Sequence, residues 1–206
     1  MAIKIDVLKD GPLIVDNLPK LNNSEGNEVP VDEKIALCRC GKSQNKPFCD
    51  GAHKDAGFEG KRETDKPLNN EREYKGKEIS VFDNRTICSH AAECVSGLNS
   101  VFDINGRPWI NPDNATVEEV IEVVKKCPSG ALSYSINDNH VRDLDREPEI
   151  NIMKNGPYDV VGNIEISVSE DLQPPSKEHY SLCRCGASKN KPYCDGSHST
   201  INFNDE

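Results

Sequence analysis

Long apolar stretches are missing from this sequence of 206 residues. No run approaches the roughly 18 consecutive apolar residues that a membrane-spanning helix needs, and the first residues, MAIKIDVLKDG, contain no apolar secretory core. We therefore expect a soluble cytoplasmic protein without a membrane partner. The apolar fraction is also low, at 35%, which is little material for one large core. Something other than apolar burial is expected to help hold the fold together.

Positive charge is scarce as well. The sequence has 25 Lys and Arg against 35 Asp and Glu, which gives a formal net charge of -10 at pH 7. Binding to a phosphate backbone begins with a positive surface, so this excess of acidic residues argues against nucleic acid as a partner. The basic surfaces of partner proteins are the better expectation.

Recognisable enzyme motifs are absent too. The sequence contains no Ser/His/Asp set, no phosphate-binding loop and no dinucleotide fingerprint, so we do not expect a self-sufficient enzyme. Its nine cysteines are an odd number, which excludes complete internal disulfide pairing. Their C-x-C and C-x5-C spacings are typical of ligand sets in a reducing compartment.

The sequence repeats itself at an offset of 145 residues. This shift places Cys38 on Cys183 and His53 on His198 without a gap between them, which identifies a true internal duplication. Each copy has a short β-rich opening, a polar connection that contains proline, and a strand-like segment, KIALCRC or HYSLCRC, that leads into the cysteines. We predict the first repeat over residues 1–58 and the second over residues 149–206.

Another ordered region lies between the repeats. Residues 74–136 contain a strand, EISVF, a cysteine loop, a helix and a final strand, ALSYSI, and polar linkers are predicted on either side at 59–73 and 137–148. Thr116 can cap the helix, with Glu119 three residues later. The predicted buried face of the helix consists of Val117, Val120, Ile121 and Val124. Phe102 and Trp109 are expected to pack against this face, and His140 and His179 to be solvated linker residues.

The two repeats end in closely similar motifs, CRCGKSQNKPFCDGAH and CRCGASKNKPYCDGSH. Three thiolates and an imidazole suit either zinc or an iron-sulfur cluster. Zinc more commonly uses two C-x2-4-C knuckles, and cysteines that are merely buried would not explain two copies of the whole constellation in polar sequence. Asp50 and Asp195 are expected to cap a short helix that presents the histidine. The candidate ligands are Cys38, Cys40, Cys49 and His53 in the first copy, and Cys183, Cys185, Cys194 and His198 in the second.

With these motifs the sequence resembles the CDGSH iron-sulfur family, the mitoNEET-type proteins. The first copy reads CDGAH, a change from one small residue to another at Ala52. The resemblance implies a [2Fe-2S] cluster in each motif, with two cysteines on the inner iron and Cys plus His on the outer iron. The outer pairs would be Cys49 with His53 and Cys194 with His198. Family members commonly pair two motifs across a dimer, so this chain resembles a monomer with an internal pseudo-dimer.

Three further cysteines, Cys88, Cys94 and Cys127, lie in the central region. Their surroundings resemble single-cluster bacterial ferredoxins, and more closely the divergent mono-cluster domain often found in CDGSH proteins. The second ligand of the ferredoxin pattern is replaced by Ala91, so the resemblance leaves a [3Fe-4S] cluster or a [4Fe-4S] cluster whose fourth iron binds another group. His90 is the candidate for that group, and an exposed loop histidine is the alternative. A structural zinc or free thiols are the alternatives for the three cysteines.

The sequence as a whole therefore predicts an α+β protein. Two small β-rich CDGSH halves would form a pseudo-twofold module, with a ferredoxin-like domain inserted between them. Three clusters in one acidic chain indicate one-electron transfer between partner proteins. Cluster delivery to apo iron-sulfur acceptors, or redox and pH sensing through clusters with labile histidine ligands, is the alternative function. A protein-interaction module that is stabilised by zinc and has no redox role is a further alternative.

Overall fold

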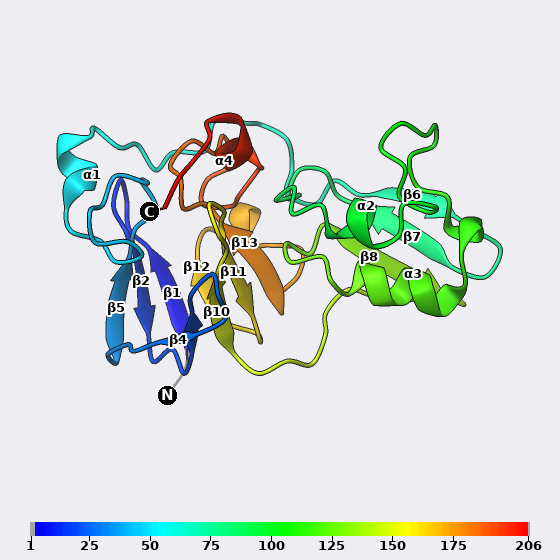
Figure 1. Cartoon of the computed structure of the whole chain (residues 1–206), viewed down its shortest axis with the longest axis horizontal. Helices are drawn as coiled ribbons and strands as arrows, with labels where there is room; N and C mark the ends of the chain where they lie inside the picture. The colour runs from blue at the N-terminus through cyan, green and yellow to red at the C-terminus, as the bar shows by residue number, and fades with distance from the viewer. Residues whose placement is uncertain (1–2, 206) are drawn as a thin grey trace.

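A computed structural model describes residues 3–205, and two lobes lie side by side in it (Figure 1). One lobe holds both repeats, with the blue strands of the N-terminal half next to the yellow and orange strands of the C-terminal half. The other lobe, drawn mostly in green, is formed by the region between the repeats. The chain has both strands and short helices, which agrees with the predicted α+β class.

The first sheet consists of β1 (Lys4–Val7), β2 (Leu13–Asp16), β5 (Lys34–Leu37) and β12 (Glu165–Ser167). Its strand order is β12-β1-β2-β5. The three strands of the first repeat are antiparallel neighbours. The edge strand β12 comes from the second repeat and runs parallel to β1.

The second sheet consists of β3 (Leu21–Asn22), β4 (Glu28–Val29), β10 (Glu149–Ile152), β11 (Tyr158–Val161) and β13 (His179–Leu182). Its order is β13-β11-β10-β3-β4, and β3 of the first repeat runs parallel to β10 of the second. Each repeat therefore lends strands to the sheet of the other. This exchange fastens the two halves together as one module.

The repeat is visible in the core as well. Ile5 and Ile150 face equivalent partners, Val15 and Val160, across their hairpins, and all four side chains are fully buried. Side chains alternate along a strand, so residues two apart share the inward face. Burying each of these aliphatic side chains contributes about 1.5–3 kcal/mol.

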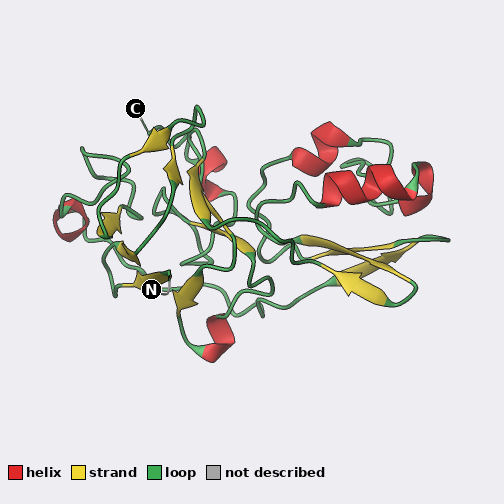
Figure 2. Ribbon diagram, turned by 90° about the horizontal axis from the view of Figure 1, so that it is seen from below, coloured by secondary structure: helices red, strands yellow, loops and turns green. Residues whose placement is uncertain are grey.

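The central lobe is an antiparallel meander in the order β6-β7-β8-β9, with helices on one face of the sheet (Figure 2). The sequence had not predicted its first and last strands. The elements are β6 (Arg72–Lys75), β7 (Ser80–Asp83), α2 (Glu93–Gly97), a 3-10 turn (Pro112–Asn114), α3 (Val117–Val124), β8 (Leu132–Ile136) and β9 (Asn139–Val141).

Helix α3 begins at the predicted capping box. The Thr116 hydroxyl accepts a hydrogen bond from the Glu119 amide at 3.3 Å, and the Glu119 carboxylate accepts one from the Thr116 amide at 2.9 Å. The inward face is shifted slightly from the predicted one because Val123 belongs to it. The buried side chains are Val120, Val123 and Val124, while Val117 and Ile121 are partly buried.

The segments predicted as surface linkers make specific contacts with both lobes. Leu68, in the segment 59–73, is buried, and its carbonyl accepts a hydrogen bond from the Asn84 side chain. Within 137–148, residues Asn139–Val141 form β9, which pairs with β8 across a turn. The turn residues Asn137 and Asp138 both have positive φ, a backbone conformation that Asn and Asp tolerate better than most residues.

Two further short helices, α1 (Ala52–Asp55) and α4 (Ser197–Thr200), follow the CDGSH-type cysteines, and a 3-10 turn spans Glu170–Leu172. No helix within residues 3–205 has the length and apolar character to span a membrane.

Candidate metal centres

The first candidate centre is built where strand β5 ends. Cys38 directly follows the strand, and its amide donates to the Pro47 carbonyl at 2.8 Å. The Cys49 amide donates to the Ala36 carbonyl at 2.8 Å, so the loop folds back beside the strand. These backbone bonds bring the third cysteine to the first two.

An aspartate then positions the histidine. One Asp50 oxygen accepts from the Ala52 amide at 3.0 Å and the other accepts from the Gln44 amide at 2.8 Å. The first contact satisfies the amide of the first residue of α1, which presents His53, but the N-cap residue is Gly51 and not the predicted Asp50. Asp195 makes the equivalent contacts, with the Ser197 amide at 3.0 Å and the Lys189 amide at 2.8 Å.

The four ligands of each motif are arranged in two pairs. The sulfurs of Cys38 and Cys40 are 3.6 Å apart, and those of Cys183 and Cys185 are 3.9 Å apart. In both copies the Nδ1 atom of the histidine lies 3.4 Å from the third sulfur. Two sulfurs bound tetrahedrally at about 2.3 Å to one metal lie about 3.8 Å apart, and a sulfur and a nitrogen lie about 3.5 Å apart. Each pair of side chains therefore has about the separation expected of two ligands bound to one metal ion.

The thiols of each C-x-C pair are coupled. The pKa of Cys38 is lowered to about 5 because the Cys40 thiol donates a hydrogen bond to it, and the pKa of Cys40 is raised by the same bond. In the second copy the roles are exchanged, and the pKa of Cys185 is lowered to about 6. One thiolate per pair is thus stabilised in the metal-free protein, and thiolate is the form that binds metal.

The two motifs meet at their C-x-C segments. Cys40 and Cys185 form an isolated antiparallel bridge. Both following glycines have positive φ, and a Cβ atom at Gly41 would lie 2.6 Å from the Cys185 carbonyl oxygen. Tyr158 of the second repeat also reaches the first motif, where its hydroxyl donates to the Cys38 carbonyl at 2.8 Å.

Arg39 and Arg184 each attach the β-rich first segment of a repeat to the cysteine motif of the same repeat. Arg39 donates to the carbonyls of Leu8 and Gly11, and Arg184 makes the matching contacts with Met153 and Gly156. Both guanidiniums are buried next to the thiols, and Arg39 interacts electrostatically with both Cys40 and Cys183. They are placed to offset negative charge at the two centres.

The third candidate centre lies in the central lobe. Cys88, Cys94 and Cys127 line one small cavity of about 30 Å³, together with Trp109 and His90. The three thiols interact electrostatically with one another. Burial raises the pKa of all three, that of Cys94 to about 11, so a bound metal is needed to stabilise their thiolates. The cavity brings together three of the predicted ligands and the predicted fourth candidate.

His90 also contacts the second CDGSH-type motif. A Cβ atom added at Gly196 would lie 2.5 Å from the ring carbon Cδ2 of His90, whereas nothing lies within 4 Å of the equivalent position at Gly51. Nearby, the Asn190 amide group donates to the Thr86 carbonyl at 2.8 Å in a buried contact. The loop that carries Cys88 is thus packed on the motif that carries Cys194.

Two histidines differ from the sequence prediction. His179 is buried in β13, where its Nδ1 atom lies 2.7 Å from the Glu178 carboxylate, so the prediction of a solvated linker residue is wrong. His140 is exposed, but it lies in β9, stacks on Phe82 at 4.5 Å and bonds to Ser133. His179 lies against Gly130 of the central region, a contact between distant segments that has no local signal in the sequence.

Phe102 is buried in the same core cluster as Val120, Val123 and Val124 of α3, and Trp109 is partly buried against that cluster. Trp109 has two additional roles, because it lines the cavity of the three cysteines and donates from Nε1 to Asp83 at 3.2 Å. Sequence reasoning missed three arginines, Arg72, Arg85 and Arg107, which line a larger hollow that shares Cys88 and Cys94 with this cavity. The cysteine spacing does not indicate them, since they come from separate segments of the central region.

Comparison with known proteins agrees with this arrangement. Residues 10–54 and 155–199 match the family model described as iron-binding zinc finger, CDGSH type, and residues 74–137 match the model described as divergent 4Fe-4S mono-cluster. The uncharacterized protein YjdI of Escherichia coli, from strain K12 and from O157:H7, is 44% identical over 61 residues. These residues make up 30% of this chain and 80% of the relative. No solved structure shows a significant match. The chain belongs to the CDGSH iron-binding family, with two CDGSH domains on either side of a divergent 4Fe-4S mono-cluster domain.

Proposed function

We propose that this protein transfers single electrons between partner proteins. The proposal assigns a [2Fe-2S] cluster to each CDGSH motif and a [3Fe-4S] or [4Fe-4S] cluster to Cys88, Cys94 and Cys127. The observation that supports it is that the three candidate centres adjoin one another in series, because the loop of the central centre packs on the second motif and the two C-x-C segments form a backbone bridge.

The first junction of this series is between the central lobe and the second motif. The ring of His90 contacts Gly196, which lies between the ligands Cys194 and His198. The hydrogen bond from Asn190 to Thr86 fixes the same two loops. A contact of the exposed His90 ring and a buried hydrogen bond therefore connect the loops of the two centres.

The second junction is between the two CDGSH motifs. The bridge between Cys40 and Cys185 joins the two C-x-C segments, and Tyr158 crosses from the second repeat to the Cys38 carbonyl. An electron accepted at the central centre could thus pass to the second motif and then to the first. Each transfer removes one electron from the donor centre and adds one to the acceptor, and the cluster iron supplies this redox chemistry.

The assignment of two-iron clusters to the CDGSH motifs rests on the pairing of the ligands. In each motif two sulfurs form one pair, and a sulfur and an imidazole nitrogen form the other. The paired arrangement supports one iron per pair, with each histidine on the outer iron.

Anaerobic purification followed by iron, sulfide and zinc analysis and EPR spectroscopy would test this proposal. We expect two reduced [2Fe-2S] signals and a third signal from the central centre. Because the centres are in contact, the reduced signals should be broadened by spin-spin interaction. A zinc-loaded, EPR-silent protein that cannot be reconstituted with iron and sulfide would contradict the proposal.

A Cys94→Ala variant would test the order of the centres. Loss of the central cluster should narrow the signal of the reduced second motif and leave that of the first motif unchanged. A Lys42→Ala variant, which alters an exposed side chain next to the first motif, is the control and should change neither signal. Three signals that are independent in every variant would refute a connected series.

Cluster delivery is the second candidate function, and the exposure of the first motif favours it. Cys49 and His53 are only partly buried, whereas Cys194 is 3% exposed. A cluster held at the first motif would be the more accessible to an acceptor protein. Mixing the loaded protein with an apo-ferredoxin, and following the acceptor's spectrum, would detect such transfer.

A further inference from the structure

Most arginines of this chain are occupied by internal contacts. Arg142 pairs with Glu71, and Arg146 pairs with the buried Glu178. The others in this group donate to backbone carbonyls, to a carboxylate or to a side-chain amide; they are Arg39, Arg62 and Arg184. These five cations stabilise the fold and present little charge to a partner.

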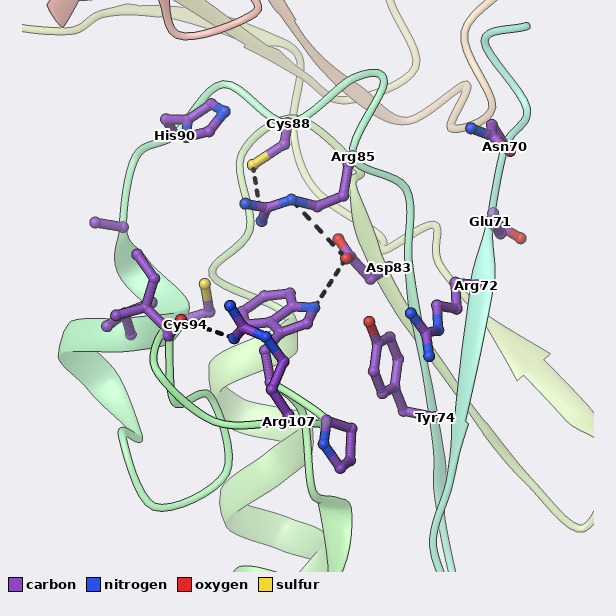
Figure 3. Close-up of a pocket in the computed structure, with 15 residues that line it drawn as sticks. Asn70, Glu71, Arg72, Tyr74, Asp83, Arg85, Cys88, His90, Cys94 and Arg107 are labelled. Atoms are coloured by element: carbon purple, nitrogen blue, oxygen red, sulfur yellow. Dashed lines mark hydrogen bonds and ion pairs between the residues drawn. The ribbon is translucent and has the colours of Figure 1, made fainter. Parts of the chain in front are cut away.

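Three other arginines, Arg72, Arg85 and Arg107, line one open hollow of about 890 Å³. They are exposed and come from β6, from the loop after β7 and from the loop before Trp109. Figure 3 shows their guanidinium groups directed into the same space. Cys88 and Cys94 also line this hollow, so the positive charge gathers in front of the third candidate centre.

All three arginines are held in place, and Arg72 and Arg107 are not neutralised by a carboxylate in the described part of the chain. Arg72 lies over the Tyr74 ring at 5.0 Å, and Arg85 lies over the Trp109 ring at 4.9 Å. Arg107 donates to the carbonyl of Gly106 at 2.6 Å. Within residues 3–205, neither Arg72 nor Arg107 forms an ion pair. Stacking on an aromatic face restricts a guanidinium while leaving its N–H groups available to an acceptor.

The two carboxylates that line the hollow, Glu71 and Asp83, already have partners within the protein. Glu71 is paired with Arg142, which lies outside the hollow. Asp83 is buried, accepts a hydrogen bond from Trp109 and lies 4.0 Å from Arg85. The hollow is therefore a positive patch on a chain whose formal net charge is -10.

We infer that this hollow docks an acidic one-electron carrier protein, which exchanges electrons with the central centre. The inference rests on the proposed electron-transfer function. It also differs from the basic partners that the net charge predicts, because local charge, and not the total, decides complementarity at the contact surface. In the forward step the reduced carrier loses one electron and the central centre gains it, with no proton or bond exchanged.

The test uses the full-length, cluster-loaded protein and a reduced plant-type [2Fe-2S] ferredoxin as the acidic probe. Stopped-flow spectroscopy would measure the reduction rate at low ionic strength in the wild type and in an Arg72→Gln/Arg107→Gln variant. We expect the rate to fall about tenfold in the variant, and the wild-type rate to fall steeply with added salt. Arg85 is left intact because it stacks on Trp109 and contacts the Cys88 sulfur.

Two controls isolate the docking step. A Lys77→Gln variant removes an exposed cation of the same lobe that lies outside the hollow, and its rate should be unchanged. Reduction by methyl viologen radical, a small cation that the positive hollow repels, should be no slower in either variant than in the wild type. Undiminished viologen rates also show that the variants retain folded, reducible clusters.

The outcomes separate the docking inference from the proposed function. If ferredoxin reduces the variant as fast as the wild type, or if a basic c-type cytochrome exchanges electrons faster than ferredoxin, the docking inference is wrong and electron transfer stands. If viologen reduces no cluster, the proposed function itself fails. If citrate shifts the EPR signal of the central cluster and this shift requires Arg72 and Arg107, the hollow binds a small carboxylate and the protein partner is refuted.

Discussion

The two CDGSH motifs have the same ligands and closely similar ligand distances, but their surroundings differ. Asn45 is exposed, whereas its equivalent, Asn190, is 2% exposed. The third ligand is partly buried in the first motif and buried in the second. Open space surrounds Gly51, whereas His90 covers Gly196. A duplicated sequence has therefore produced two centres with unequal access.

The inserted region causes this difference. The Glu63 amide donates to the Lys189 carbonyl at 2.8 Å, and the Lys191 ammonium lies 3.3 Å from the Glu63 carboxylate. Arg62 donates to the Asn190 side chain at 2.7 Å. The segment that enters the central lobe thus crosses the second motif and leaves the first one open. A single chain can in this way give two similar metal sites different roles.

The largest expected effect concerns the start of β13, where Glu178 is fully buried and its repeat equivalent, Glu33, is exposed. Glu178 accepts hydrogen bonds from Arg146 at 2.8 and 2.7 Å. Replacing Glu178 by Gln leaves the positive partner incompletely paired, so we expect the free energy of unfolding to fall by about 3 kcal/mol at neutral pH. Urea unfolding followed by circular dichroism would measure it, and Glu33→Gln should change it by less than about 0.5 kcal/mol.

The same variant has a predicted pH dependence. Burial acts to raise the pKa of Glu178, but hydrogen bonds from His179 and Arg146 outweigh it and hold the pKa below the ordinary value of 4.5. The carboxylate therefore stabilises the fold above pH 4.5, and this contribution is lost as the pH falls further. The stability difference between wild type and Glu178→Gln should shrink below pH 4.5. A difference that is constant down to pH 3 would contradict this assignment.

The next prediction compares Gly51 with Gly196, which occupy equivalent positions in the two repeats. Both have positive φ, so alanine is strained at either position, by about 1 kcal/mol. At Gly196 the added methyl group must also displace His90, and we expect a total destabilisation of about 2 kcal/mol for Gly196→Ala. Thermal unfolding of Gly196→Ala and Gly51→Ala would compare them. Equal losses would show that His90 moves aside freely.

A smaller effect is expected from the equivalent asparagines. Asn190→Ala removes the hydrogen bonds with Thr86 and Arg62 and should cost about 1–2 kcal/mol. Asn45→Ala removes an exposed side chain and should be nearly neutral. Urea unfolding of the two variants would test whether the contact with the central lobe stabilises the second motif.

The smallest effect is a difference in cluster release within the wild type. The more accessible first motif should lose its cluster to an iron chelator about tenfold faster than the second, which corresponds to about 1.4 kcal/mol in the opening step. EPR spectra taken during chelation would distinguish the two. The rates should converge in His90→Ala, and equal rates in the wild type would remove the basis for assigning different roles.

Much of the site was predictable because the ligands are close in the chain. The C-x-C and C-x3-H spacings define both candidate ligand sets within 16 residues each, and Asp50 accepts hydrogen bonds from amides two residues after it and six residues before it. Helix α3 was predictable for the same reason, since its capping box spans Thr116 to Glu119. Such features depend on local geometry, which the sequence expresses directly.

The remaining features depend on contacts between distant segments. The sequence predicts a linker at β9 because Asn139–Val141 is short and polar, and only pairing with β8 makes it a strand. The sequence predicts a solvated His179 because the burial of this residue requires the packed second sheet and Glu178 beside it. Context of this kind overrides local composition, particularly in short strands.

Residue type and spacing are sufficient to predict the candidate ligand sets, the duplication and the central cysteine region. The tertiary structure alone decided that the repeats exchange strands, that His90 and Asn190 join the central lobe to the second motif, and that three arginines gather before the third centre. These are long-range contacts, and their partners are chosen by the packing of the whole chain.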